Sequence, residues 1–239
     1  MFFRVKGRPP MLLAEEREAL AAAGRRLAER GLVIGTSGNL SARRDDLVAV
    51  TPTGGVISQL TAADMTVIRL ADGQIADGEL APTSEVPMHL AIYRATGAGA
   101  IAHTHATTST AVGLVCDEIP LVHYTMLSLG GTVRVAPYAC YGTEELAALV
   151  VKALEYKQAA LMRNHGSIAL GSTVAKSVDN LELVEWAAET YTKAVRLGAA
   201  LHTAGAPAAR PRELTPQEQE DVINAALASG YGTTKKLAK

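Results

Sequence analysis

The chain has 239 residues, 48% of them hydrophobic, and a formal net charge of −1 at pH 7, so it can bury a substantial core and shows no charge excess that favours nucleic acid or a membrane surface. Two cysteines are too few for a disulfide framework and suit a reducing compartment. We recognise neither a signal-peptide core nor a stretch of ~20 apolar residues, so we expect a cytoplasmic protein.

The pattern along the chain predicts a mixture of helices and strands. Segments rich in Ala, Leu and charged residues predict helices, and β-branched runs that end at Pro or Gly predict strands. The expected helices are 11–31, 82–96, 142–156, 172–199 and 215–227. The expected strands lie within 47–55 and 65–75, each followed there by a loop, at 100–103, and as two short strands within 159–170, folded about the turn 164–166.

Three of the expected helices have recognisable N-caps. Thr83 or Ser84 caps the helix 82–96, and Thr143 caps the helix 142–156. The last helix begins with Thr215 followed by a proline, and Glu218 completes a capping box.

Strands and helices mix without strict βαβ alternation. This order predicts an α/β or α+β fold with three layers, in which helices flank a central, mostly antiparallel sheet. We expect a single domain over residues 1–239. Its last part, 206–239, follows a Pro- and Ala-rich linker and is expected to be a C-terminal helix and a mobile tail.

The segment "AIAHTHATTS" (100–109) carries two histidines two residues apart. Alternate residues of a strand point to the same face, so His103 and His105 can approach one ion. Zinc takes about four ligands, mostly His, Cys or carboxylate. The remaining histidine candidates are His89, His123, His165 and His202.

His165 stands out among these candidates because "RNHGS" places it at a hairpin tip beside Gly166. Glu85 in "PTSEV" is a candidate carboxylate ligand, although an acid in the first turn of a helix also simply offsets the helix dipole. His89 lies four residues after Glu85 and shares its helix face, where it either supports Glu85 or makes a structural hydrogen bond. His202 is expected to be exposed to solvent.

Three loops combine glycine or proline with hydroxyl residues: "GTSGN" (35–39), "TPTGG" (51–55) and "PTSE" (82–85). Glycine lets the backbone approach an anion, and hydroxyl and N–H groups can then form a phosphate cradle. None is a Walker or dinucleotide motif, and each alone is equally compatible with an ordinary turn.

Together with "HYTMLSLGG", "APYACYG" and "NHG", and in this order, these motifs resemble the class II aldolase/adducin family from about residue 12 to the tail. Within the family the resemblance is strongest to aldolases of ketose 1-phosphates such as L-fuculose 1-phosphate. It implies a homotetramer with sites at subunit interfaces, one Zn²⁺ per subunit and a phosphorylated ketose as substrate, with neither nucleic acid nor membrane as partner.

The resemblance also assigns roles to individual residues. It implies that His103, His105 and His165 hold the zinc, and that Glu85 is both the resting fourth ligand and the catalytic acid/base. The implied phosphate-binding residues are Thr36, Asn39, Thr53, Gly54, Thr83 and Ser84.

Two tyrosines complete the site that the resemblance implies. Tyr124 would come from a neighbouring subunit to protonate or orient the aldehyde oxygen, and Tyr231 would come from the C-terminal tail. Tyr141 departs from the family pattern, because phenylalanine stands at that position in the fuculose phosphate aldolases. This departure concerns the aldehyde side of the site and not the metal.

The implied reaction is zinc-dependent cleavage of a ketose 1-phosphate to dihydroxyacetone phosphate and a short aldehyde such as L-lactaldehyde, through an enediolate stabilised by the metal. Related reactions are alternatives: pentulose-phosphate 4-epimerases, which usually carry aspartate in place of Glu85, and sugar-phosphate dehydratases or decarboxylases. A non-enzymatic, adducin-like scaffold is disfavoured because such domains lose the zinc ligands.

Overall fold

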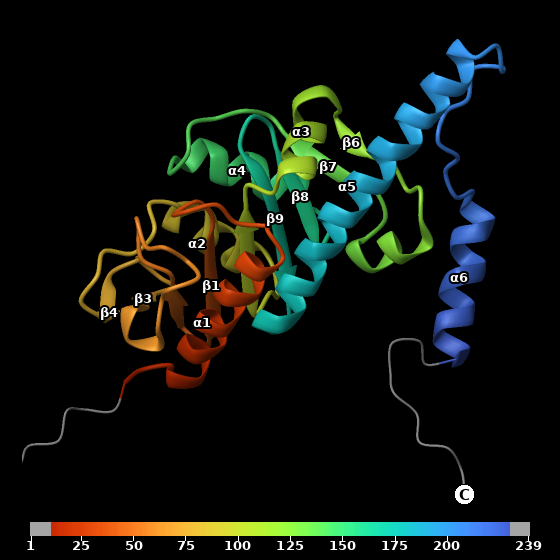
Figure 1. Ribbon diagram of the computed structural model, residues 1–239. Helices are drawn as coiled ribbons and strands as arrows, with labels where there is room; N and C mark the ends of the chain where they lie inside the picture. Colours follow the sequence, from red (N-terminus) through yellow and green to blue (C-terminus); the bar gives the residue numbers. More distant parts are fainter. Residues whose placement is uncertain (1–10, 230–239) are drawn as a thin grey trace, which may run out of the picture.

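The computed structural model describes residues 11–229. Helices occur along the whole of this range (Figure 1). They are α1 (Ala14–Glu29), η1 (Ala62–Asp64), α2 (Val86–Ala95), α3 (Thr107–Val115), η2 (Tyr124–Leu129), α4 (Glu144–Ala153), α5 (Val174–Thr203) and α6 (Pro216–Ser229), the two η elements being 3₁₀ turns.

The strands belong to one mixed sheet. They are β1 (Asn39–Arg44), β2 (Leu47–Val50), β3 (Thr66–Arg69), β4 (Ile75–Asp77), β5 (Ala100–Thr104), β6 (Glu118–Ile119), β7 (Val133–Ala136), β8 (Ala159–Met162) and β9 (Gly166–Gly171). Their order across the sheet is β4-β3-β2-β1-β5-β9-β8-β7-β6. All the pairs are antiparallel except β7 with β8. The expectation of a mostly antiparallel sheet is therefore confirmed.

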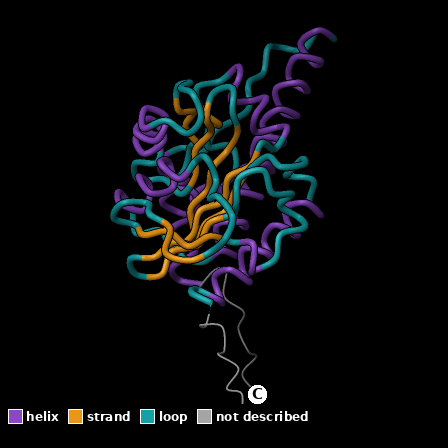
Figure 2. The backbone as a smooth tube through the Cα atoms, turned by 90° about the vertical axis from the view of Figure 1, so that its left-hand side faces the viewer, coloured by secondary structure: helices purple, strands orange, loops and turns teal. Residues whose placement is uncertain are grey.

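Helices cover both faces of the sheet, which makes three layers (Figures 1 and 2). Strand β5 shows how alternate side chains divide between the faces. Ala100 and Ala102 belong to the core beneath α1, α3 and α5. Ile101 belongs to the opposite core, beneath α2 and α4. The predicted α/β architecture is therefore confirmed.

The structure confirms most of the expected elements and moves the start of one helix. Thr143 and Thr173 accept hydrogen bonds as side-chain N-caps of α4 and α5. Neither Thr83 nor Ser84 is the N-cap of α2, however, because the helix begins only at Val86 and Glu85 occupies the cap position. The Thr83 hydroxyl instead accepts a hydrogen bond from the backbone N–H of Glu85, at 3.3 Å. Glu85 therefore lies at the end of a turn that precedes the helix.

Helix α6 lies at the edge of the molecule in Figure 1, where it contacts η2. Its capping box forms as predicted, with Thr215 and Glu218 exchanging hydrogen bonds. No residue of α6 is buried. Among the described residues, no helix is long and apolar enough to span a membrane.

Candidate metal centre and substrate cavity

His103 lies near the end of β5, a fully buried strand in the middle of the sheet. Its Nδ1 atom is 2.8 Å from the backbone carbonyl oxygen of Ser167 on the neighbouring strand β9. A carbonyl can only accept, so Nδ1 carries the proton and Nε2 keeps a lone pair when the ring is neutral. Histidines that bind a metal through one ring nitrogen typically donate such a hydrogen bond from the other nitrogen.

The other two histidines converge on His103 from the ends of neighbouring strands. His105 lies just beyond β5, and its Nε2 atom is 3.1 Å from Nε2 of His103. His165 lies at the tip of the β8–β9 hairpin. Each of the three ring pairs has centroids 4.8–5.0 Å apart, and one nitrogen from each ring lies within 4.8 Å of the others.

The residue that lets the backbone turn at the tip of the β8–β9 hairpin is not the expected glycine. The left-handed residue is Asn164, with φ = 55°, and not Gly166. Gly166 is required for another reason: a Cβ atom there would overlap the carbonyl oxygen of Thr104 and lie 2.9 Å from Cδ2 of His105. The glycine thus permits the close approach of the two strands that carry the histidines.

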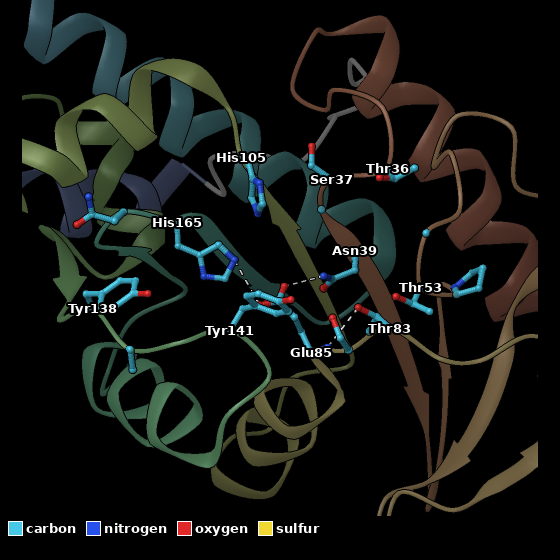
Figure 3. A pocket seen from close by; sticks show the side chains of 16 residues that line it. Thr36, Ser37, Asn39, Thr53, Thr83, Glu85, His105, Tyr138, Tyr141 and His165 are labelled. Carbon is cyan, nitrogen blue, oxygen red and sulfur yellow. Dashed lines mark hydrogen bonds and ion pairs between the residues drawn. The ribbon is translucent and has the colours of Figure 1, made fainter.

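Glu85 faces the histidine cluster from the N-terminal end of α2, and Figure 3 shows it with His105 and His165. Its Oε2 atom is 3.1 Å from Nε2 of His103, and its Oε1 atom is 3.3 Å from Nε2 of His165. Oε2 also accepts a hydrogen bond of 2.8 Å from Nδ2 of Asn39. Oε1 is buried and has no hydrogen-bond partner among the described residues.

Charge interactions in this cluster oppose the effect of burial on its acid. Burial acts to raise the pKa of Glu85, but the positive charge of His103, together with His165 and the amide of Asn39, lowers it well below its usual value. Burial acts to lower the pKa of His103, and the charge of Glu85 outweighs it and raises that pKa. Burial and the charge of His103 lower the pKa values of His105 and His165 to about 4.

These residues fit a divalent cation. Two neutral imidazoles, a third that can release its Nε2 proton, and an ionised carboxylate are the donor set that zinc prefers in proteins. The orphaned Oε1 of Glu85 is a buried negative atom that a cation would satisfy. The residues that would hold the ion are His103, His105, His165 and Glu85.

A cavity of about 360 Å³ opens directly onto this cluster. His105 and His165 line one side of it, and the three loops rich in small residues, the last of which ends in Glu85, line the other (Figure 3). It contains all six residues expected to bind phosphate: Thr36, Asn39, Thr53, Gly54, Thr83 and Ser84. The structure therefore brings the expected metal and phosphate residues together, while their roles remain predictions.

The expected tyrosines are distributed differently. Tyr141 lines the cavity, and so do Tyr138 from the same loop and Asn164 of the hairpin tip. Tyr124 is partly exposed on η2 and does not line this cavity within the single chain. Tyr231 lies outside the described residues.

Two further observations concern the histidines that were left open. His202 is exposed, as expected. His89 is fully buried, and its side chain contacts Asn39 and Ser41, not the carboxylate of Glu85. Sequence reasoning did not single out Ser41 or Tyr93, which complete its surroundings. The available signals were the four-residue spacing of Glu85, His89 and Tyr93 and the two-residue spacing of Asn39 and Ser41.

Comparison with known proteins agrees with this site. The family model described as "Class II Aldolase and Adducin N-terminal domain" matches residues 18–192, which is more than half of the chain. The 5-deoxy-D-ribulose 1-phosphate aldolase of Bacillus thuringiensis serovar kurstaki is 32% identical over 225 residues, covering 93% of this chain and 99% of that protein.

The L-fuculose phosphate aldolase of Escherichia coli strain K12 is 37% identical over 163 residues, which cover 67% of this chain and 75% of that protein. Among solved structures, an L-fuculose 1-phosphate aldolase superimposes with a TM-score of 0.81 at 32% identity, covering 90% of this chain and 97% of the other.

The chain belongs to the class II aldolase/adducin family. It is an enzyme of the metal-dependent aldehyde-lyase class, close to the fuculose phosphate aldolases.

Proposed function

We propose that this enzyme is a zinc-dependent aldolase that cleaves a ketose 1-phosphate to dihydroxyacetone phosphate and a short aldehyde. Its relatives act on L-fuculose 1-phosphate and 5-deoxy-D-ribulose 1-phosphate, two ketose 1-phosphates that both end in a methyl group. We therefore propose a substrate of that class, for which the aldehyde product is L-lactaldehyde or acetaldehyde.

The observation that carries the proposal is the composition of the cavity. A single space joins the histidine cluster and Glu85 to three loops of hydroxyl, amide and glycine residues. Such loops offer neutral donors to a phosphate group. A substrate anchored there places its reacting carbons beside Glu85, and this fixed orientation lowers the entropic cost of reaching the transition state.

Breaking the C3–C4 bond of such a ketose leaves negative charge on the C2 oxygen and releases the C4 oxygen as a carbonyl. A bound divalent cation supplies a Lewis acid that stabilises this oxyanion. Glu85 exchanges a proton with the carbon next to the carbonyl through Oε1, the oxygen that has no hydrogen-bond partner among the described residues. The loops around Thr36, Thr53 and Ser84 bind the phosphate, which does not react.

The proton on the C4 oxygen must be taken up as the C3–C4 bond breaks, which calls for a second proton-transfer group besides Glu85. We propose that Tyr124 of a neighbouring subunit serves this purpose in a homotetramer, and that Tyr231 of the C-terminal tail is a second catalytic tyrosine. The apolar groove between η2 and α6, which includes Tyr124, Ile223 and Leu227, is consistent with a subunit contact there. Residues 1–239 would then form one domain, with 206–239 as its C-terminal arm.

The test is a panel of ketose 1-phosphates with release of dihydroxyacetone phosphate as the readout, measured before and after treatment with a chelator. We expect cleavage of the methyl-ended substrates, loss of activity with the chelator and recovery with Zn²⁺. Absence of dihydroxyacetone phosphate from every member of the panel would overturn the proposal.

The same assay distinguishes the epimerase alternative. A 4-epimerase would interconvert two pentulose 5-phosphates without releasing dihydroxyacetone phosphate. The free thiols of Cys116 and Cys140 agree with our further proposal of a reducing, cytoplasmic location.

A further inference from the structure

Behind Glu85, a stripe of polar side chains fills the space between β1 and α2. Asn39 and Ser41 are alternate residues of β1 and point to one face, while His89 and Tyr93 lie one turn apart on α2. All four side chains are buried, His89 and Ser41 completely. Buried polar groups destabilise the fold unless they find partners, so their hydrogen bonds must be accounted for.

The stripe forms an unbroken chain of contacts that ends at the carboxylate. Nδ2 of Asn39 donates to Oε2 of Glu85 at 2.8 Å, and Oδ1 of Asn39 contacts Nε2 of His89. On the other side of the ring, Nδ1 of His89 is 2.7 Å from Oγ of Ser41. The Ser41 oxygen is in turn 2.8 Å from the hydroxyl of Tyr93.

When the His89 ring is neutral, the chemistry of these groups allows one direction for every hydrogen bond. An ionised carboxylate can only accept, so Asn39 must turn its NH₂ group toward Glu85 and its carbonyl oxygen toward His89. His89 must then donate from Nε2 and accept at Nδ1, which makes Ser41 the donor to the ring. The remaining partner, Tyr93, donates its hydroxyl proton to the Ser41 oxygen.

The protonation states of the two ring groups agree with this direction. Burial lowers the pKa of His89 to about 4, so its ring is neutral at pH 7 and one nitrogen can accept. Burial raises the pKa of Tyr93 well above its usual value, so its hydroxyl keeps the proton that it donates.

We propose that His89 is a positioning residue, which, through Asn39, holds Oε2 of Glu85 as a hydrogen-bond acceptor and directs Oε1 toward the metal and the substrate. Without the Nε2–H group of His89, the amide of Asn39 is free to reverse and to present its oxygen to the carboxylate, which repels it. The carboxylate would then lose its fixed orientation. Ser41 and Tyr93 act on Glu85 indirectly, because they hold His89 in the tautomer that donates from Nε2.

Only one part of this inference rests on the proposed function, namely the effect of the Glu85 orientation on catalysis. With Oε2 occupied by Asn39, the proton that Glu85 takes up or releases resides on Oε1. The geometric part, which concerns one tautomer and one amide orientation, stands or falls without any substrate.

The geometric part is tested by NMR on protein labelled with ¹⁵N in its histidines. At pH 7 the ring of His89, identified by its absence in a His89→Gln protein, should show the pattern of a neutral ring with its proton on Nε2. A charged ring, or a proton on Nδ1, would overturn the proposal.

The consequence for the site is tested with paired variants. His89→Gln retains an N–H donor toward Asn39, whereas His89→Leu has similar bulk and no donor. We expect His89→Leu to weaken Zn²⁺ binding by the apoprotein, or turnover, by about 10- to 100-fold. We expect His89→Gln to restore both to within about threefold of the wild type. Equal values for His89→Leu and the wild type would contradict the proposal, as would a glutamine variant no better than leucine.

Two smaller changes keep the test decisive if His89→Leu fails to fold. Tyr93→Phe and Ser41→Ala each remove a single buried hydroxyl, and both should weaken Zn²⁺ binding or turnover. Ser177→Ala removes an equally buried hydroxyl on α5, bonded within its own helix, and should leave both measurements unchanged. If the wild type cleaves no ketose 1-phosphate, the proposed function fails, and the tautomer and the Zn²⁺ affinities still decide this inference.

Discussion

The backbone of Gly166 lies directly against the carbonyl group of Thr104, so no side chain separates the hairpin that carries His165 from the strand that carries His103. This contact sets the spacing of the three imidazoles. It also shows that the metal centre depends on how closely two backbone segments pack, and not only on the histidines themselves.

The first prediction is that Gly166→Ala damages the site and the fold together. The added methyl group would overlap the Thr104 carbonyl oxygen and crowd His105, so one strand must move. We expect the free energy of unfolding to fall by about 1–3 kcal/mol and Zn²⁺ binding to weaken. Gly97→Ala, at an exposed position with open space around it, is the matched control. Equal denaturation midpoints for the two variants would contradict the argument.

The second prediction concerns the metal. A ligand that binds only the folded state raises its stability, so adding Zn²⁺ to chelator-treated wild-type protein should raise the thermal unfolding midpoint and restore activity. In His105→Ala the cluster loses one of its three imidazoles. That variant should show neither effect, and retention of full activity without metal would overturn the assignment of the site. Metal content and differential scanning calorimetry are the measurements.

Much of this site could be predicted from sequence because its signals are local. The spacing of His103 and His105 and the small-residue loops lie in short segments, each readable by itself. Helix α3 received no such prediction. Its segment "TTSTAVGLV" is rich in β-branched residues, which are weak helix formers. The helix begins where it does because both carboxylate oxygens of Glu185, distant in sequence, accept hydrogen bonds from the backbone of Thr108 and Ser109.

The polar stripe behind Glu85 escaped prediction for a related reason. Its members come from β1 and α2, and only the pairing of β1 with β5, which sets Asn39 opposite His103, brings them to the metal centre. The start of α2 was misplaced because Thr83 and Ser84 are both good N-caps, and local preference does not show that the turn before the helix continues to Glu85. The pairing of distant strands therefore determines where these side chains lie, and local sequence patterns do not show that pairing.

The third prediction is a pH dependence of stability that His89 causes. An unfolded histidine takes up a proton near pH 6.5, whereas buried His89 resists it down to about pH 4. The unfolded chain binds more protons between these values, so His89 contributes stability above pH 6.5 that is lost as the pH falls toward 4.

The measurement is urea denaturation of metal-free wild type and His89→Gln at pH 7.5 and pH 5. His105 and His165, whose pKa values are also lowered, add to the loss in both proteins, and His103 opposes it. The difference between the two proteins isolates His89. Wild type should lose about 2 kcal/mol more than the variant, and equal losses would show that His89 does not titrate in this way.

The fourth prediction separates phosphate binding from metal binding. Ser84 lines the cavity, and its hydroxyl would donate to a phosphate oxygen. Hydrogen bonds to charged groups contribute about 1.5–3 kcal/mol. Ser84→Ala should therefore raise the KM for a ketose 1-phosphate by about 10-fold or more while Zn²⁺ affinity stays unchanged. Ser172→Ala, exposed and outside the cavity, controls for the loss of a serine hydroxyl. A fall in Zn²⁺ affinity for Ser84→Ala alone would contradict the assigned role.

The last prediction concerns the end of the substrate that becomes the aldehyde. Tyr141 lines the cavity together with Tyr138 and Asn164, and in Figure 3 it lies beside Glu85. Its phenolic hydroxyl can hydrogen-bond a hydroxymethyl group of a substrate but gains nothing from a methyl group. Tyr141→Phe should therefore shift the ratio of kcat/KM values toward the methyl-ended ketose 1-phosphate, and a difference of about 1–3 kcal/mol corresponds to 10- to 200-fold.

The metal affinity should not change, because Tyr141 is not among the residues that would hold the ion. Tyr156→Phe, which alters a largely exposed tyrosine outside the cavity, should leave the ratio as it is. An unchanged ratio in Tyr141→Phe would place the aldehyde end of the substrate elsewhere in the cavity.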